Sequence, residues 1–248
     1  MTEPSAGLEQ EETEHDVDLI HECVVKMAKE ISDFMDITPD KQRMDSLMVA
    51  ANIRNLSLLE LFYTCVANLC KIMDGRGTKI PDEQHHYIEK DDYNKCIYHK
   101  RDMDATERTV IVMKDADILI KICDSTGDFD DTSEYQLLIR LLKERTIIDD
   151  GGSRRLRQKE EVENPSEVLL NPSDPEATFR YKAGGRHLGY VGNVVEAVGE
   201  KSSLVIVYDY QQNTYADNQF MKDYLNEKKD FSDGSFIVAD GAYSGEEN

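Results

Sequence analysis

The sequence predicts a mixed α/β chain in which a helical front part is followed by strands. Two observations indicate helices, because apolar residues recur every three or four positions over residues 17–35 and again over residues 55–73. A third observation indicates a sheet, because residues 203–210 read SLVIVYDY, a run rich in β-branched and aromatic side chains. The chain of 248 residues is long enough to bury a sizeable core.

The N-terminal region, residues 17–51, is predicted to hold a helix and then a first core strand. The helical stripe ends at Thr38-Pro39-Asp40, which breaks the pattern. Residues 44–51 are apolar around one acid, so their periodicity leaves both a buried strand and a helix open. Residues 1–16 are polar and acidic, and we expect them to form a disordered tail.

A helical insertion is predicted over residues 52–187. Ser57 and Glu60, three positions apart, resemble a capping box at the start of its strongest helix. Residues 149–176 contain two adjacent glycines and three prolines and are predicted to be an irregular linker. The predicted helices of the insertion are residues 55–73, 113–124 and 133–144.

The last part, residues 188–248, is predicted to form part of a sheet. Residues 188–210 have the pattern of a hairpin, and Asp217 begins a short helix that leads to a short buried strand at residues 235–240. A helical crossover places this strand parallel to an earlier one. Asp240 would then stand at the carboxyl end of a parallel strand, where ligands and metals gather in open α/β sheets.

The net charge of −21 is unusual for a protein that handles DNA, since DNA binding rests on Lys and Arg side chains that neutralise phosphates. Any basic patch that binds DNA must therefore be confined to a short stretch of the chain. The best candidate is the stretch 153–159, for which an ordinary solvated loop is the alternative interpretation. Its basic residues are Arg154, Arg155, Arg157 and Lys159.

Five cysteines are present, and no two stand as C-x-x-C. Cys65 and Cys70 lie in an apolar helical stretch and are predicted to be core thiols. This pattern favours reduced thiols in a cytoplasmic protein over a zinc site. No apolar run of about 18 residues occurs, so no membrane partner is expected.

Three aspartates stand in patterns that suggest chemistry. Asp240 follows an apolar strand, where a buried carboxylate needs a cation or hydrogen-bond donors, although an Asp-Gly turn is the alternative. Asp45 is a lone acid between apolar residues, and a helix N-cap is the alternative. Asp174 precedes a proline, so its backbone is extended and a turn role is the alternative.

These aspartates lie within longer stretches that carry a family resemblance. The stretches RMDSLMVAANIRNLSLLELFYTCVANL, NPSDPEATFRYKAGGRHLGYVGNVVEAVGE, YDYQQNTYADNQFMKDYL and IVADGAYSGEEN resemble one group of bacterial insertion-sequence transposases of the Asp-Asp-Glu (DDE) kind. The resemblance covers most of residues 17–248. It implies an N-terminal helical transposase domain and an RNase H-like catalytic core, of which this chain would hold an incomplete mixed sheet.

The resemblance also implies roles for the aspartates. Such enzymes cleave DNA and transfer its strands at insertion-sequence ends, using Mg²⁺ ions held by two Asp and one Glu. Asp45 matches the first aspartate, although Leu47 stands where the family often has Thr. Asp240 matches the second aspartate. Asp174 matches a recurrent D-P-E-A-like element and is the alternative first ligand or a positioning residue.

The third carboxylate is expected far downstream of Asp240, and Glu246 and Glu247 are too close to serve. The sequence therefore predicts a C-terminally truncated transposase that is inactive or incomplete. Its expected partners are inverted-repeat DNA ends and itself or a full-length transposase. The alternative is a fragment that binds DNA ends or a transposase and inhibits without catalysis. An acidic interaction module and a two-carboxylate nuclease are further hypotheses.

Overall fold

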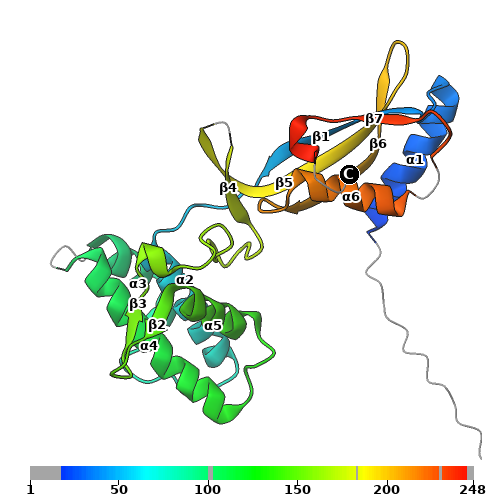
Figure 1. The fold of residues 1–248 in the computed structure, drawn as a ribbon. Coiled ribbons are helices and arrows are strands. Elements are labelled where there is room, and N and C mark those ends of the chain that lie inside the picture. Colours follow the sequence, from blue (N-terminus) through cyan, green and yellow to red (C-terminus); the bar gives the residue numbers. More distant parts are fainter. Residues whose placement is uncertain (1–17, 100–102, 183, 229–230, 245–248) are drawn as a thin grey trace, which may run out of the picture. The chain divides into compact units, whose positions relative to one another are not determined.

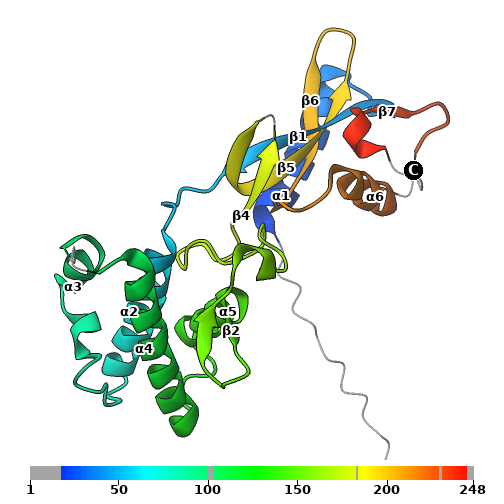
Figure 2. The ribbon, with the colours of Figure 1, turned by 60° about the vertical axis from the view of Figure 1, so that its left-hand side comes forward.

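The structure is a computed structural model that describes residues 18–99, 103–182, 184–228 and 231–244 (Figures 1 and 2). The predicted acidic tail at residues 1–16 lies outside the described residues. The chain divides into two compact units. The sheet unit contains the residues up to Ser46, Asn193–Asp209 and the residues from Asp217 onward, and the helical unit contains Leu47–Gly192 and Tyr210–Ala216.

A five-stranded mixed sheet has the strand order β4-β5-β1-β7, and β6 also pairs with β5. The predicted mixed α/β class is therefore confirmed. Residues 44–51, left open by their periodicity, lie in a strand up to Ala50 rather than in a helix. The strands are β1 (Lys41–Ala50), β4 (Thr178–Lys182), β5 (Gly185–Val198), β6 (Ser203–Gln212) and β7 (Phe236–Val238).

The last strand, β7, runs parallel to β1, as the sequence predicts. Their register pairs Lys41 with Phe236 and Arg43 with Val238. The prediction that residues 235–240 form a buried strand is wrong in one respect, because Phe236 is 51% and Val238 54% exposed. An apolar run cannot distinguish a strand covered on both faces from one covered on a single face.

Helix α6 (Asp217–Glu227) packs on the buried face of the sheet unit. Side chains alternate along β1, so that Gln42 and Met44 are buried whereas Arg43 and Asp45 are exposed. The Tyr224 hydroxyl of α6 donates a 2.7 Å hydrogen bond to Gln42 Oε1 and so fixes α6 to the buried face. The face that carries Asp45 is consequently the solvent-exposed one.

Helix α1 (Leu19–Met35) begins at Asp18, whose side chain accepts hydrogen bonds from two backbone N–H groups of the first turn. It ends at Asp36, which has a left-handed backbone. The predicted helix at residues 17–35 is confirmed from Leu19 onward. Its apolar stripe is poorly covered, since Ala28 is the one buried residue of the helix and Phe34 is 91% exposed.

The helical unit is built around α2 (Leu58–Gly75), which packs against α4 (Ala105–Thr126) and α5 (Ser133–Arg145). The predicted capping box of Ser57 and Glu60 is present. Helix α4 is longer than the predicted 113–124, because Asp104 and Glu107 form a second capping box at its start. Short elements complete the unit: η1 (His85–Ile88), α3 (Asp92–Asn94), η2 (Lys95–His99), β2 (Thr146–Ile148), β3 (Arg154–Leu156) and η3 (Lys159–Glu161).

The helical unit has a dense apolar core. Phe62, Leu69 and Met113 are fully buried in it, together with the thiols of Cys65 and Cys70. The predicted core role of these two cysteines is thus confirmed, and burial raises the pKa of each thiol to about 12. The five cysteines all lie in the described residues, and none of them forms a disulfide.

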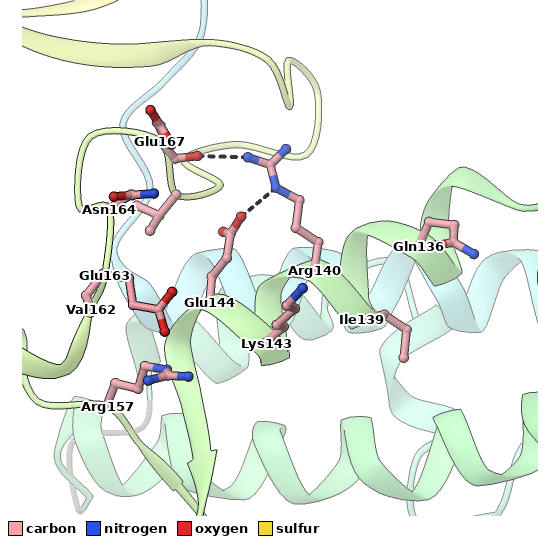
Figure 3. Close-up of a pocket in the computed structure, with 11 residues that line it drawn as sticks. Gln136, Ile139, Arg140, Lys143, Glu144, Arg157, Val162, Glu163, Asn164 and Glu167 are labelled. Carbon is pink, nitrogen blue, oxygen red and sulfur yellow. Dashed lines mark hydrogen bonds and ion pairs between the residues drawn. The ribbon is translucent and has the colours of Figure 1, made fainter. Parts of the chain in front are cut away.

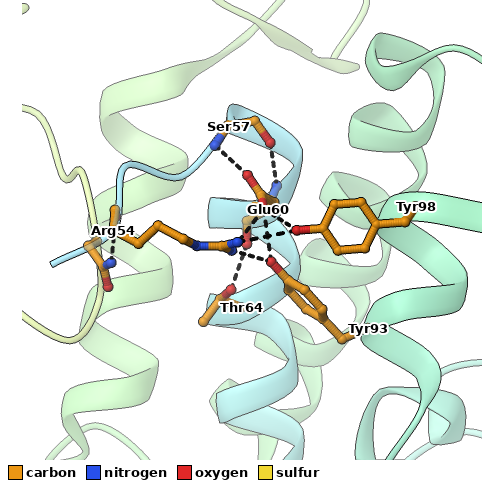
Figure 4. A network of polar contacts seen from close by, with 7 residues as sticks. Arg54, Ser57, Glu60, Thr64, Tyr93 and Tyr98 are labelled. Carbon is orange, nitrogen blue, oxygen red and sulfur yellow. Dashed lines mark hydrogen bonds and ion pairs between the residues drawn. The ribbon is translucent and has the colours of Figure 1, made fainter.

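A polar network ties the start of α2 to the segment that carries α3 and η2 (Figure 4). The Glu60 carboxylate accepts hydrogen bonds from Arg54, at 2.8 Å, and from Tyr93 and Tyr98, at 3.0 and 3.3 Å. Its other oxygen accepts the backbone N–H of Ser57 at 2.8 Å. A nearly buried acid is stabilised in this way because each of its oxygens has donors.

Candidate active site

Asp45 lies on β1, and Asp240 lies two residues beyond the end of β7. The last printed pair of the parallel register is Arg43 with Val238, and two residues further along each chain are Asp45 and Asp240. Adjacent strands are about 4.8 Å apart, so a continued register would make Asp240 a neighbour of Asp45. Both residues are exposed.

Local hydrogen bonds orient both carboxylates. Asp240 is the N-cap of η4 (Gly241–Tyr243), and its Oδ1 accepts the backbone N–H of Ala242 at 2.8 Å. The Asp45 Oδ1 accepts the backbone N–H of Ser46 at 2.9 Å. The turn-cap alternative for Asp240 thus describes its local bonding correctly. A cap bond occupies one lone pair, and each carboxylate has further acceptor sites for a cation.

The short helix η4 carries Tyr243 from the exposed face into the interior, where the side chain is 3% exposed. Its hydroxyl donates a 2.7 Å hydrogen bond to Asn193 Oδ1 on β5. Burial raises the pKa of Tyr243, a hydrogen bond with the Ser46 side chain lowers it, and the carboxylates of Asp217, Asp45 and Asp240 raise it further. The Tyr243 hydroxyl is therefore a neutral group with three carboxylates near it.

Asp217 is a member of this group that the sequence did not indicate. The sequence predicts only that Asp217 begins a helix, and α6 does begin at this residue. The structure adds that Asp217 is 3% exposed and close enough to act electrostatically on Tyr243. A buried carboxylate at a helix N-terminus is favoured by the helix dipole. No sequence signal separates such a residue from an ordinary cap.

The positively charged side chain of Arg43, on the same face of β1 as Asp45, forms an ion pair with Glu196. Arg43 precedes Asp45 by two residues, and its Nη2 lies 2.6 Å from Glu196 Oε2 on β5. Because the Arg43 charge is balanced by Glu196, it does not cancel the negative potential of Asp45 and Asp240. Beside them, a hollow of about 450 Å³ between α6 and β7 has Asp240 on its wall. Its apolar lining includes Met221, Leu225, Phe231, Phe236 and Ile237.

The donor set fits the Mg²⁺ that the family resemblance implies. Mg²⁺ is a hard cation that takes oxygen ligands and keeps several of its waters, so one or two exposed carboxylates suit it better than a closed cage. Asp45 supplies such oxygens from β1, and Asp240 supplies them from the cap of η4 that follows β7. The neighbouring positive charge is held by Glu196. Asp45 and Asp240 would be the residues that hold the ion.

Asp174, the alternative ligand, lies in the helical unit. Its Oδ1 accepts a hydrogen bond from the hydroxyl of Tyr190 on β5. Burial and the Asp174 carboxylate raise the pKa of Tyr190, so this tyrosine stays a donor. Asp174 lies on neither β1 nor β7, the two strands that Asp45 and Asp240 are associated with.

The predicted DNA-binding residues carry less free positive charge than their sequence suggests. Arg154 on β3 forms an ion pair with Asp117 at 2.8 Å, and Arg155 forms one with Glu161 at 2.7 Å. Lys159 is exposed at the start of η3. The DNA-binding role of these residues remains a prediction.

Arg157, the fourth predicted residue, lines a hollow of about 420 Å³ in the helical unit (Figure 3). Its Nη1 donates to the carbonyl of Glu161 at 3.0 Å. Arg140 in the same hollow is 2.6 Å from Glu144. Three basic side chains in this lining face three acidic ones, so the hollow has no net charge that would attract phosphate. The charged lining residues are Arg140, Lys143, Arg157, Glu144, Glu163 and Glu167.

Comparisons with family models, curated proteins and solved structures found no match to this chain. In the part of the chain that the structure describes, no helix combines the length and apolar character needed to cross a bilayer.

Proposed function

We propose that the chain is a DDE-transposase-related protein whose sheet unit is an RNase H-like core that handles DNA phosphodiesters. The observation that supports this most directly is the parallel pairing of β1 with β7, because Asp45 and Asp240 each follow the last paired residues by two positions. The strand order β6-β5-β1-β7, with a hairpin on one side of β1 and a parallel crossover strand on the other, is the arrangement that such a core requires. Both the RNase H-like fold and the action on DNA phosphodiesters are part of what we propose.

In this proposal Asp45 and Asp240 bind Mg²⁺ through carboxylate oxygens and direct it to the open face of the sheet. Bound Mg²⁺ would supply charge neutralisation at phosphate and would activate a water or a DNA 3′-hydroxyl as the nucleophile. The bond from Asp240 to Ala242 N–H and the cap of η4 fix the orientation of one ligand. The buried bond from Tyr243 to Asn193 anchors η4 to β5 and so restrains that ligand further.

The proposal assigns to this chain two of the three carboxylates that the resemblance implies. We therefore expect measurable metal binding by this chain. DNA is the proposed substrate, and its binding has to overcome a net charge of −21. With two of the four predicted basic side chains in ion pairs, the inhibitory DNA-end-binding alternative has less support than the metal site.

The direct test is the affinity for Mn²⁺, a paramagnetic substitute for Mg²⁺, measured by the loss of free-ion spin-resonance signal. Asp45→Asn and Asp240→Asn should each weaken binding by at least about tenfold, because each removes a charged ligand. Asp33→Asn, at an exposed position of α1, is the matched control and should bind as the wild type does. Equal affinity in all four proteins would rule out the proposed site.

Catalysis and DNA binding are tested separately on the same proteins. Nicking of supercoiled plasmid in Mn²⁺ that disappears in Asp240→Asn would show that the two carboxylates suffice for cleavage. Metal binding without nicking would support the metal site and would count against cleavage by these two carboxylates alone. Nicking that does not need a metal ion would contradict the proposal. Salt-sensitive binding to duplex DNA that is lost when Lys159 and Arg157 are replaced by Gln would support the inhibitory alternative.

A further inference from the structure

A second group of side chains, far from the sheet carboxylates in sequence, gathers in the helical unit. His86, Asp92 and Cys96 each offer one potential metal-ligand atom, and these three atoms lie within 4.8 Å of one another. His86 Nδ1 is 2.8 Å from Asp92 Oδ2, and Cys96 Sγ is 3.5 Å from the same oxygen. An imidazole nitrogen, a carboxylate oxygen and a sulfur thus converge on one point.

Three consecutive short elements bring these residues together. His86 lies in the 3₁₀ turn η1, Asp92 begins α3, and Cys96 lies in η2, which is a π-helical turn. Asp92 and Cys96 are four positions apart, so they face the same side of the helical segment. Single π-helical turns are rare and occur frequently at functional sites.

Asp92 is the buried centre of the group, with 6% exposure. Its Oδ2 accepts a third hydrogen bond, at 2.7 Å, from the hydroxyl of Tyr63 on α2. Burial alone raises the pKa of Asp92, but the hydrogen bonds from Tyr63 and His86 outweigh it and lower the pKa overall. Asp92 is therefore an anion at neutral pH, held where an anion needs positive charge beside it.

Space for an ion adjoins the group. A cavity of about 50 Å³ is lined by His86 and Cys96, and also by Arg108 and Asp115. A cavity of this size holds an ion with a bound water, since one water needs roughly 10–15 Å³ of such space. The positive charge of Arg108 is directed at the backbone carbonyls of Cys96 and Ile97, at 2.7 and 3.0 Å. The carboxylate of Asp115 adds a negative charge to the wall.

We propose that His86, Asp92 and Cys96 form a binding site for a zinc-class divalent cation, with water as the fourth ligand. Nitrogen, oxygen and thiolate sulfur at the corners of a tetrahedron are the ligand set that Zn²⁺ prefers, whereas Mg²⁺ avoids sulfur. Binding would release the Cys96 thiol proton to solvent and replace the bonds that His86 and Cys96 now make to Asp92.

The site would be structural. Tyr63 connects Asp92 directly to α2, so a bound ion would fasten η1, α3 and η2 to the core of the helical unit. The sequence lacks the paired cysteines typical of zinc sites and on that ground favours reduced thiols over zinc. A site with one cysteine has no such spacing signal. It uses neither Asp45 nor Asp240.

The test is a titration of the full chain with Zn²⁺ in competition with a chromophoric chelator. We expect one equivalent to bind, with affinity reduced at least about tenfold in Cys96→Ser and His86→Gln. Two matched controls should bind as the wild type does: His85→Gln, at the exposed neighbour of His86, and Cys23→Ser, at the exposed cysteine of α1. Unchanged affinity in Cys96→Ser, or no stoichiometric binding, would overturn the proposal.

Two further measurements keep the test decisive if a variant fails to fold. In the wild type, Zn²⁺ should protect Cys96 from alkylation and leave Cys23 reactive, as mass spectrometry of the two peptides would show. Cobalt substitution should give a thiolate-to-metal charge-transfer band. Equal alkylation of Cys96 with and without Zn²⁺ would contradict the site. Asp45→Asn should retain full zinc binding, which separates this proposal from the proposed magnesium site.

Discussion

In the helical unit, α2, α4 and α5 enclose Phe62, Leu69 and Met113 so completely that none of the three is exposed. In the sheet unit, Phe34, Phe236 and Val238 are half or more exposed. The helical unit thus holds the larger enclosed core, whereas the sheet unit leaves these three apolar side chains largely exposed. Apolar burial is the main source of stability. We infer that the helical unit contributes most of the free energy of unfolding. The proposed metal-binding residues belong to the sheet unit.

The largest expected effect tests the closed core. Phe62→Ala should destabilise the helical unit by about 4 kcal/mol, because it removes a fully buried ring and leaves a cavity. Hydrogen–deuterium exchange, resolved by peptide, should show loss of protection in α2, α4 and α5. Phe34→Ala, at a position that is 91% exposed, should change stability by less than about 0.5 kcal/mol. Equal effects from both would refute the contrast between the units.

A second substitution tests how β1 and β5 are held together. Gly189 has a φ of +137°, and a Cβ there would collide with the backbone of Val49 and Ala51. Gly189→Ala should therefore cost about 3 kcal/mol, through overpacking and backbone strain. Gly192→Ala meets only the Leu47 and Val49 side chains and should cost less. Exchange that rises in β1 and β5 but not in α2 would show that this contact between the two strands opens without the packed helices.

The polar network of Figure 4 predicts a pH dependence confined to the helical unit. Burial raises the pKa of Glu60, but bonds from Ser57, Tyr93 and Arg54 lower it to about 2 from an ordinary value of 4.5. Because the folded pKa is depressed, this stabilisation is full above about pH 4.5 and is lost as the pH falls toward 2.

Glu60→Gln should accordingly cost about 2 kcal/mol at pH 7 and flatten the stability profile between pH 4.5 and pH 2. Urea unfolding at a series of pH values measures both effects. Glu30→Gln, on an exposed part of α1, is the control and should keep the wild-type profile. A variant profile parallel to that of the wild type would show that Glu60 is not the titrating group.

The smallest expected effect concerns the sheet unit. Tyr243→Phe removes the hydroxyl that bonds to Asn193 and leaves a buried acceptor unsatisfied, at a cost of about 1 kcal/mol. Exchange should increase in β5 and η4 and remain unchanged in α2. Tyr181→Phe, at a position that is 72% exposed, should have no effect. If protection in α2 also fell, the two units would be coupled more tightly than we infer.

The elements with local signals could be predicted from the sequence. Helix α2 is set by its apolar period and the Ser57–Glu60 box, and β6 by β-branched residues. Partners distant in sequence could not be predicted. The ion pair of Arg154 with Asp117 joins residues 37 positions apart, and the bond from Tyr243 to Asn193 joins residues 50 apart. Such pairs depend on packing rather than on any local pattern.

The candidate sites divide along the same line. Asp45 and Asp240 could be proposed because each stands beside an apolar run within a longer resemblance, and the parallel strand order follows from the helical crossover. The group of His86, Asp92 and Cys96 could not be predicted, because 3₁₀ and π turns have no apolar periodicity that a sequence would reveal. The exposure of β7 could not be predicted either, because a sequence does not show which face of a strand is covered.

The placement of the helical unit between β1 and β5 also has a consequence for biosynthesis. Strand β1 leaves the ribosome early, but its partner β7 follows only after the chain between Ala50 and Phe236 has been made. At about 5–20 residues per second this delay is roughly ten to forty seconds. The other neighbour of β1, strand β5, begins at Gly185 and is made earlier, so β1 can pair with β5 first. Until β7 is made, the opposite edge of β1 is an unpaired strand edge that another chain could join.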